Sequence, residues 1–268
     1  MTQIKQVQAR GILSRASGFI RAFDYTLNPY SGCAFACTYC YAAFFAPSEA
    51  LQDTWGRWVL VKENALALLR KRRKRPLIGA SIYMSSVTDP YQPVERQLRL
   101  TRVVLEELLT YHQVHLVIQT RSPLVTRDLD LLTQFDHLRV NMSVTTDDET
   151  VRKTFEPLCP SNQQRLEAIQ TIAAAGVDAC ITLTPLLPVQ DAAAFGASLR
   201  ATGVEKFVIQ NFHPTKSRFV AGTGAVARAL LRERGWDDAH YQQVRRTLSA
   251  HLPTLREGQA GFSPIWGE

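Results

Sequence analysis

Three cysteines lie within one short stretch, at Cys33, Cys37 and Cys40. Their C-x3-C-x2-C spacing lets the thiolates converge on one centre, and three thiols cannot all pair as disulfides. Iron-sulfur clusters take Cys thiolate ligands, usually four, so three ligands on one loop would leave one iron open for chemistry. The alternatives are unrelated core thiols or a structural zinc site, which needs four Cys or His ligands. No fourth ligand for zinc is evident near the loop.

Strands and helices alternate around this loop. Strands are predicted at residues 23–28, 77–84, 114–119, 138–144, 177–183 and 204–209. Helices are predicted at residues 62–73, 95–110, 128–135, 162–175 and 191–202, with two more at 225–233 and 237–251. Such alternation predicts parallel strands joined by right-handed crossovers. We therefore expect an α/β fold, a (β/α)6 partial barrel, with its chemistry at the carboxyl ends of the strands.

Length and composition favour a single domain with a large core. We expect residues 1–20 to form an N-terminal extension of uncertain structure, 21–210 the partial barrel and 211–268 a C-terminal helical segment. Five cysteines, three of them clustered, indicate metal or redox chemistry in a reducing compartment. No apolar run is long enough to span a membrane. The expected location is therefore cytoplasmic.

The chain carries a net charge of +7, which favours polyanionic partners. The charge is densest at residues 70–75, R-K-R-R-K-R. This run is either a solvated helix end, where cations are favourable, or a patch that binds phosphates. Farther along, Gly222 and Gly224 are interpreted as a helix start, and His213 and Phe219 as residues that line either a pocket or the core.

The cysteine spacing, with the aromatic Tyr39 just before Cys40, resembles the signature of the radical S-adenosylmethionine (radical SAM) superfamily. In that family three cysteines hold a 4Fe-4S cluster, and the open iron binds S-adenosylmethionine (SAM). One-electron reduction then yields a 5'-deoxyadenosyl radical. The resemblance implies the cofactors 4Fe-4S and SAM and a one-electron reductant of the flavodoxin or ferredoxin type.

Three further segments narrow the resemblance. They are S-S-V-T-D-P-Y-Q-P-V-E at 85–95, T-R-S at 120–122 and F-E-P-L-C-P at 155–160. Together they resemble the spore photoproduct lyase-like branch, over roughly residues 23–210. The branch implies action on DNA photoproducts or another nucleic acid. A radical reaction on another substrate and a non-enzymatic zinc or nucleic-acid-binding module are the alternatives.

The resemblance implies where SAM binds. Ser85, Ser86, Thr88 and Asp89 stand where the superfamily binds the methionine amine, and hydroxyl and carboxylate oxygens accept hydrogen bonds from an amino group. Arg121 matches the basic residue that pairs with the methionine carboxylate, in place of the branch's usual lysine.

Other positions match residues near the ligands. Ser143 matches the hydroxyl partner of that carboxylate. The resemblance implies that Tyr41 lies beside the adenine and that Tyr39 is part of the apolar cover of the cluster, and ordinary aromatic packing is the alternative for both. Arg152 and Glu156 either reach the active site or form a surface ion pair on a helix turn.

The hydrogen donor departs from the branch. In the photoproduct lyase, a cysteine after the second strand returns a hydrogen atom to the product radical, and Ser86 occupies that position here. A serine O-H is a poor hydrogen-atom donor because its bond is much stronger than S-H. Candidate catalytic residues are therefore Tyr39 and Ser86, with Cys159 as another donor. Cys180 is predicted to be a buried small hydrophobe.

Overall fold

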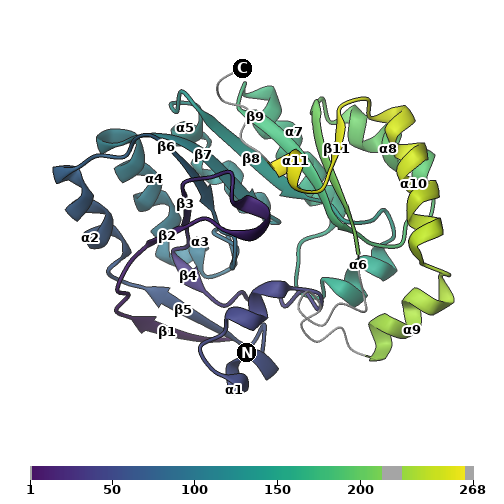
Figure 1. Ribbon diagram of the computed structural model, residues 1–268, viewed down its shortest axis with the longest axis horizontal. Coiled ribbons are helices and arrows are strands. Elements are labelled where there is room, and N and C mark those ends of the chain that lie inside the picture. The colour runs from purple at the N-terminus through teal and green to yellow at the C-terminus, as the bar shows by residue number, and fades with distance from the viewer. Residues whose placement is uncertain (1, 213–224, 263–268) are drawn as a thin grey trace.

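A computed structural model describes residues 2–212 and 225–262 and contains a curved eight-stranded sheet. Its strand order is β11-β10-β9-β8-β7-β6-β3-β2. The strands are β2 (Leu13–Arg15), β3 (Tyr25–Leu27), β6 (Ile78–Met84), β7 (Gln113–Thr120), β8 (Leu138–Ser143), β9 (Asp178–Leu186), β10 (Lys206–Asn211) and β11 (Leu255–Glu257). From β3 to β10 every neighbouring pair is parallel. The six predicted strands are present in the predicted order, which confirms the partial barrel (Figure 1).

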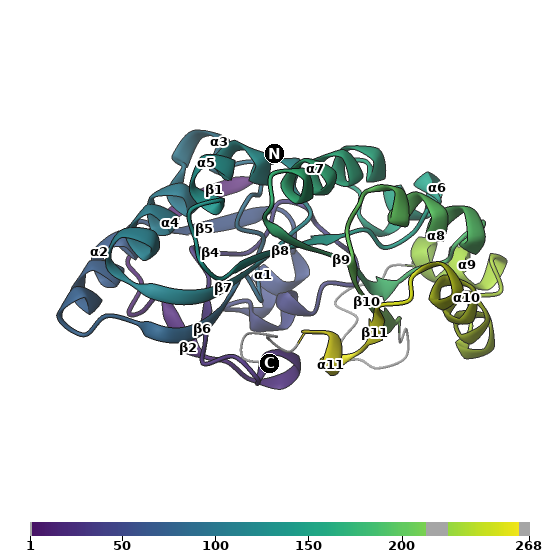
Figure 2. The ribbon, with the colours of Figure 1, turned by 90° about the horizontal axis from the view of Figure 1, so that it is seen from above.

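Helices cover the outer face of the curved sheet (Figure 2). The α-helices are α1 (Glu49–Asp53), α2 (Ala65–Arg70), α3 (Glu95–Leu98), α4 (Leu100–Tyr111), α5 (Leu129–Leu132), α6 (Glu149–Phe155), α7 (Asn162–Ala174), α8 (Ala192–Ala201), α9 (Ala225–Glu233), α10 (Asp238–His251) and α11 (Gln259–Phe262). Short 3-10 helices are η1 (Gly18–Ile20), η2 (Tyr41–Phe45), η3 (Lys71–Lys74) and η4 (Pro123–Asp128). Side-chain caps begin three of these helices: Asp148 caps α6, Ser161 caps α7 and Asp191 caps α8.

A second, three-stranded sheet joins β1 (Gln3–Val7), β5 (Trp58–Lys62) and β4 (Tyr30–Ser31). The sequence pattern assigns no structure to residues 1–20, yet they supply β1, β2 and η1. The pattern also misses β5. It predicts a helix that begins at residue 62, whereas α2 begins at Ala65 in the structure. The two strands depend on each other, since β1 pairs with β5 along its whole length. β1 has little apolar character, whereas β5, W-V-L-V-K, has the apolar, Val-rich composition of a strand.

Two predicted helices differ in the structure. The helix predicted at 95–110 breaks at Arg99, whose φ of 50° is left-handed and separates α3 from α4. The helix predicted at 128–135 is shortened to the single turn of α5, which directly follows the 3-10 helix η4. The C-terminal segment, predicted to be helical, also contributes β11 to the sheet edge.

The core lies between the sheet and its helices. Five strands each contribute a side chain with 0% exposure: Leu27, Ile82, Leu116, Val140 and Ile181. Burying such a side chain is worth roughly 1.5–3 kcal/mol relative to leaving it exposed. This core fixes the strands in register, so their carboxyl ends form one edge.

Some expectations lie outside what the structure describes. Gly222, Gly224, His213 and Phe219 fall in residues 213–224, which are not described. The division of the chain into one domain with an extension stays a prediction. Among residues 2–212 and 225–262, no helix has the length and apolar character needed to cross a membrane.

Candidate cluster and cofactor site

The cysteine loop follows β3 and β4 and turns at positions where a side chain does not fit. Gly32 has a φ of 77°, and a Cβ there would lie 2.6 Å from Trp58. Gly56 has a φ of 91°, and a Cβ there would lie 2.3 Å from the Cβ of Ala36. Ala36 itself adopts a left-handed φ of 55°. The path of the loop therefore depends on these two glycines.

All three cysteines of the loop are free thiols held largely away from solvent. Cys33 and Cys37 are buried and Cys40 is partly buried. Burial raises the pKa of Cys33 well above its usual value and that of Cys40 to about 12. A hydrogen bond from Cys159 instead lowers the pKa of Cys37, against the effect of burial. Three thiols on one loop fit the donor set of an iron-sulfur cluster with one iron free of protein ligands.

A cluster and a single ion place different demands on the ligands. Within the described residues, no three His, Cys, Asp or Glu side chains are placed to hold one metal ion. A cluster instead takes each cysteine on a different iron, so its ligands need not meet at one point.

The loop after β6 packs directly on the cysteine loop. Thr88 Oγ1 donates to the Gly32 carbonyl at 2.6 Å, and the Ala34 amide donates to Gln92 Oε1 at 2.9 Å. The Tyr41 hydroxyl donates to the Ser86 carbonyl. The structure thus brings the predicted SAM-binding segment against the predicted cluster ligands. Thr88 uses its hydroxyl proton for this contact.

Ser85 is the strongest sign of a ligand in this segment. It has a left-handed φ of 73°, is buried, and its hydroxyl has no hydrogen-bond partner among the described residues. Buried hydroxyls are normally satisfied, so an unpaired one indicates a missing partner. The adjacent Ser86 accepts a long hydrogen bond from Asn28 Nδ2 at 3.4 Å, and Asn28 also accepts from the Val87 amide. Sequence reasoning missed Asn28 as a support of this loop.

Asp89 joins two strand ends. Its carboxylate accepts from the Tyr91 amide at 2.9 Å, the Thr120 hydroxyl at 2.8 Å and the Arg121 amide at 2.8 Å. Burial raises the pKa of Asp89, while these hydrogen bonds act to lower it. Asp89 therefore fixes the loop after β6 to the end of β7, and its contact with an amine stays a prediction.

Arg121 points into the molecule, so it is not a surface charge at a loop start. Its guanidinium donates to the Tyr39 hydroxyl at 3.1 Å and lies 3.5 Å from Glu156 Oε1. Tyr39 in turn donates to Glu156. Burial raises the pKa of Tyr39 well above its usual value, so the phenol stays a neutral donor. Arg121 has five N-H donors, and these contacts leave several free for a carboxylate.

Ser143 is buried at the end of β8, beside β7. Its hydroxyl accepts from Gln119 Nε2 at 2.8 Å and lies 3.2 Å from Thr182 Oγ1. Tyr83 donates to the same Gln119 at 2.7 Å. A polar row thus crosses four neighbouring strands. Sequence analysis found only Ser143, the last residue of β8, through the family resemblance, and the other three lie inside their strands.

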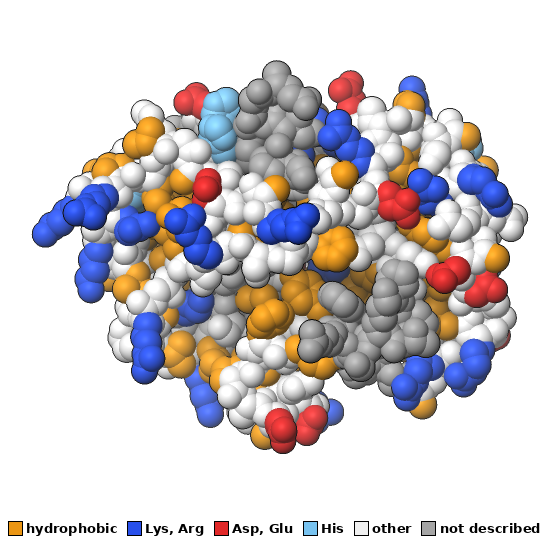
Figure 3. Space-filling model, viewed as in Figure 1, with side chains coloured by type: hydrophobic (Ala, Val, Ile, Leu, Met, Phe, Trp, Pro, Cys, Tyr) orange, Lys and Arg blue, Asp and Glu red, His pale blue; other side chains and the backbone are white. Residues whose placement is uncertain are grey.

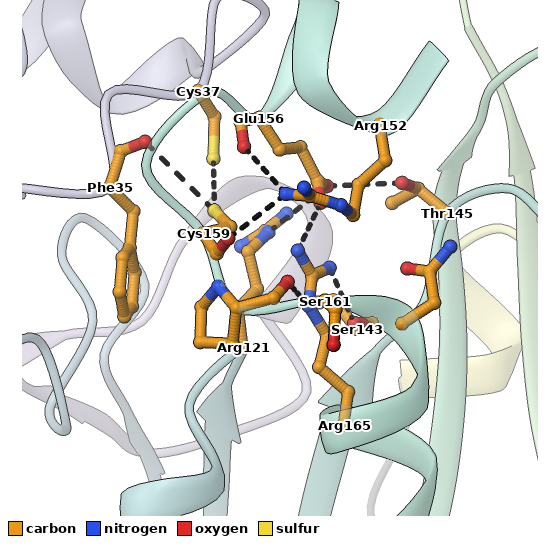
Figure 4. A network of polar contacts seen from close by, with 12 residues as sticks. Phe35, Cys37, Arg121, Ser143, Thr145, Arg152, Glu156, Cys159, Ser161 and Arg165 are labelled. Carbon is orange, nitrogen blue, oxygen red and sulfur yellow. Dashed lines mark hydrogen bonds and ion pairs between the residues drawn. The ribbon is translucent and has the colours of Figure 1, made fainter. Parts of the chain in front are cut away.

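Glu156 is the centre of a buried charge network (Figure 4). Arg165 pairs with it at 2.6 Å and Thr145 donates to it at 3.0 Å, in addition to Tyr39 and Arg121. Burial acts to raise the pKa of Glu156, but Arg165, Arg121 and the Tyr39 hydroxyl together lower it to about 2. The glutamate is therefore anionic at neutral pH and fully enclosed.

Arg152 pairs with Glu149 and contacts only the backbone carbonyl of Glu156. It pairs with Glu149 at 2.8 Å and donates to the carbonyls of Glu156 and Cys159 at 3.2 and 2.9 Å. A surface ion pair between Arg152 and Glu156 is therefore wrong. Sequence reasoning missed Arg165, although it lies on the buried face of α7 with Ile169, where a charge needs a partner.

The basic run at residues 70–75 lies away from this site. Arg73 forms two hydrogen bonds with Glu107 at 2.5 and 2.6 Å, and its guanidinium lies 3.3 Å from the centre of the Tyr111 ring. The run precedes the amino end of β6, whose seven residues span about 20 Å. Ser85 follows the opposite end. In Figure 3, Lys and Arg side chains accordingly gather at the left, over the α2 region, away from the apolar centre.

The comparison with known families follows this geometry. Residues 27–201 match the Radical SAM superfamily. The chain therefore belongs to the radical SAM superfamily. Membership implies an iron-sulfur cluster and SAM.

Several relatives share part of the sequence. An uncharacterised protein of Methanocaldococcus jannaschii is 37% identical over 61% of this chain and 61% of its own length. One from Acidianus two-tailed virus is 33% identical over 61% and 56%, and one from Mycobacterium tuberculosis is 32% identical over 62% and 50%. The chain thus spans less than two thirds of these relatives.

Solved structures share the fold. A cysteine-to-serine mutant of spore photoproduct lyase matches with a TM-score of 0.65 at 15% identity, over 95% of this chain and 81% of that one. Streptococcus suis SuiB bound to precursor peptide SuiA matches with a TM-score of 0.55 at 11% identity, over 87% and 48%. The lyase-like fold expected from the sequence is confirmed.

Proposed function

We propose that Cys33, Cys37 and Cys40 hold a 4Fe-4S cluster with which the chain cleaves SAM reductively. The observation that carries this proposal is the unpaired Ser85 hydroxyl, buried in the loop that packs on the cysteines. When bound, the reduced cluster supplies the electron that cleaves the sulfonium to a 5'-deoxyadenosyl radical. Superfamily membership supports this function over a non-enzymatic zinc module.

The strand-end residues then bind and orient SAM. Ser85 and Ser86 accept from the methionine amine, and Arg121 pairs with the carboxylate through the N-H groups that Tyr39 and Glu156 leave free. Tyr41, which the family resemblance assigns to the adenine, lies at the same loop and donates to the Ser86 carbonyl. Asp89, Thr88 and Ser143 hold the loops and strand ends around these groups.

Anaerobic purification tests the cluster. The protein should contain iron and sulfide in equal amounts, and dithionite with SAM should yield 5'-deoxyadenosine. Cys180→Ala is the matched control, because Cys180 is buried in β9 away from the loop, and it should keep both properties. A colourless protein with one tightly bound zinc would refute the proposal.

We further propose a nucleic acid as the substrate. Three observations support it: the net charge of +7, the lyase-like fold, and exposed basic residues on α6, which is hydrogen-bonded to the cysteine loop, and on α9. Lys153 on α6 and Arg228 and Arg232 on α9 are exposed, and α6, which packs on α9, follows the carboxyl end of β8. A lyase variant has been solved with bound AdoMet and dinucleoside spore photoproduct.

Salt dependence separates the two basic regions. Affinity for irradiated DNA should fall linearly with salt on a log-log plot, and the slope should drop by nearly one for each phosphate that the protein no longer binds. The variant K153Q/R228Q/R232Q should reduce the slope. The matched control K71Q/K74Q/R75Q neutralises exposed residues of the run at 70–75 and should change it little. No affinity for intact or irradiated DNA at low salt would favour a radical reaction on another substrate.

The reductant and the location are also proposals. We propose a flavodoxin or ferredoxin type protein as the electron donor, because a one-electron carrier matches the chemistry of the superfamily. A cytoplasmic location fits five free thiols, which a reducing compartment preserves. Iron-sulfur content after expression with and without oxygen would test the need for such a compartment.

A further inference from the structure

A fourth thiol lies against one of the three loop cysteines. Cys159 Sγ is 3.6 Å from Cys37 Sγ, and both residues are buried. The distance is well beyond a disulfide bond of about 2.05 Å, so this is a contact between free thiols. Among the described residues, neither Cys33 nor Cys40 has such a contact with another thiol.

The backbone holds Cys159 in this place. Its amide donates to the Glu156 carbonyl at 3.1 Å, and its carbonyl accepts from Arg152 at 2.9 Å. Arg165 Nε donates to the carbonyl of the next residue, Pro160, at 3.0 Å. Figure 4 shows the Cys159 sulfur beside both Cys37, at 3.6 Å, and the Phe35 carbonyl, which accepts from the same thiol at the longer distance of 3.9 Å. These contacts fix the backbone of Cys159, and burial restricts the positions open to its thiol.

The cysteine loop is tied to the same turn from its own side. The Thr38 amide, next to Cys37, donates to the Phe155 carbonyl at 2.8 Å. Main-chain contacts on both sides thus hold the segments that carry the two thiols next to each other. A fixed contact of this kind is what a hydrogen bond to a metal ligand requires.

We propose that Cys159 is a positioning residue that tunes the cluster through a hydrogen bond to Cys37. This inference rests on the proposed function. As a ligand, Cys37 is a thiolate without a proton, so the Cys159 S-H must be the donor. Cys159 keeps its proton and is neither oxidised nor reduced, and the electron comes from the external reductant.

The hydrogen bond should make reduction easier. Hydrogen bonds to the sulfurs are among the factors that set cluster potentials. The added electron makes the ligand sulfur more negative, so a donor stabilises the reduced form more than the oxidised form. Its removal should lower the equilibrium constant for one-electron reduction by roughly threefold to tenfold, where tenfold corresponds to about 59 mV.

Potentiometric titration of the anaerobically reconstituted protein, followed by electron paramagnetic resonance, tests the inference without an activity assay. Cys159→Ala should keep full iron and sulfide but have a lower midpoint potential. Cys159→Ser retains a donor and should restore part of the shift. Cys180→Ala, another buried cysteine far from the loop, should match the wild type.

The outcomes separate this inference from the function on which it rests. An unchanged potential in an iron-replete Cys159→Ala protein would overturn the inference and leave the cluster proposal intact. Loss of iron in both Cys159 variants would also overturn it, because Cys159 would then be needed for assembly. A wild type without any cluster would instead refute the proposed function.

Discussion

Glu156→Gln should destabilise the protein strongly. The substitution keeps the size of the side chain but removes the negative charge that Arg165 and Arg121 face. Glu156 and Arg165 both have 0% side-chain exposure, so solvent cannot replace the missing charge. Removing one partner of a buried ion pair typically costs about 3–5 kcal/mol.

The pKa of Glu156 gives a second measure of the same effect. In the unfolded chain this carboxyl has its ordinary pKa of 4.5, and in the folded protein about 2. A shift of this size corresponds to about 3 kcal/mol of stability. Because the folded pKa is the lower one, this stability is present above pH 4.5 and is lost as the pH falls toward 2. Both routes thus give a similar figure.

Urea denaturation of the anaerobic protein measures the effect. At pH 7 the free energy of unfolding of Glu156→Gln should be about 3 kcal/mol lower than that of the wild type, and the difference should shrink as the pH falls from 4.5. Glu149→Gln is the matched control, since Glu149 begins α6, which Glu156 directly follows, pairs with Arg152 and is 45% exposed. It should cost less than about 1 kcal/mol. Equal costs for the two variants, or a difference that does not change with pH, would refute the reasoning.

Three further predictions concern the two loops. Alanine at Cys33, Cys37 or Cys40 should abolish cluster assembly, as measured by iron and sulfide content, and full iron in any of them would contradict the ligand set. Ser85→Ala should weaken SAM binding by calorimetry with little change in thermal stability, because the hydroxyl has no partner among the described residues; a loss of stability with unchanged SAM affinity would oppose this role. Gly32→Ala should lower iron content, because its Cβ would lie 2.6 Å from Trp58 at a positive φ, and wild-type iron content would show that the loop can adapt.

The sequence predicted the barrel because its signals are local. Runs rich in β-branched residues, such as β7, and helices with capping residues, such as α7 with Ser161 and Gln164, carry their structure in their own pattern. The second sheet was missed because β1 and β5 are 50 residues apart and neither strand is stable without the other. The break at Arg99 was missed because nothing in an arginine favours a left-handed conformation.

In the candidate site, too, the residues close in sequence were predicted and the contacts between distant residues were not. Cys33, Cys37 and Cys40 are close in sequence, so their spacing alone indicated a shared centre. Glu156 and Arg165 meet because α6 and α7 fold back on the same strand ends, and no spacing rule predicts this pairing. The contact of Cys159 with the loop is equally non-local, since it joins residues 122 positions apart.

The buried network around Glu156 should matter more for holding Arg121 in place than for the stability of the fold. Buried ion pairs can often be replaced by apolar residues of similar volume without loss of stability. The double variant E156Q/R165M should therefore recover most of the stability lost in Glu156→Gln. It should not recover SAM binding, because Arg121 loses the anion that holds its guanidinium beside Tyr39.

The double variant thus separates the contribution of Glu156 to stability from its contribution to SAM binding. A charge-assisted hydrogen bond is worth about 1.5–3 kcal/mol, so the SAM affinity of E156Q/R165M should be at least about tenfold weaker than that of the wild type. Calorimetric titration of SAM into the reconstituted protein measures this, with urea denaturation of the same samples as the stability readout. Recovery of both properties would mean that Arg121 needs no support from Glu156. Recovery of neither would mean that the carboxylate is required for the fold itself, since no apolar partner can then replace the pair.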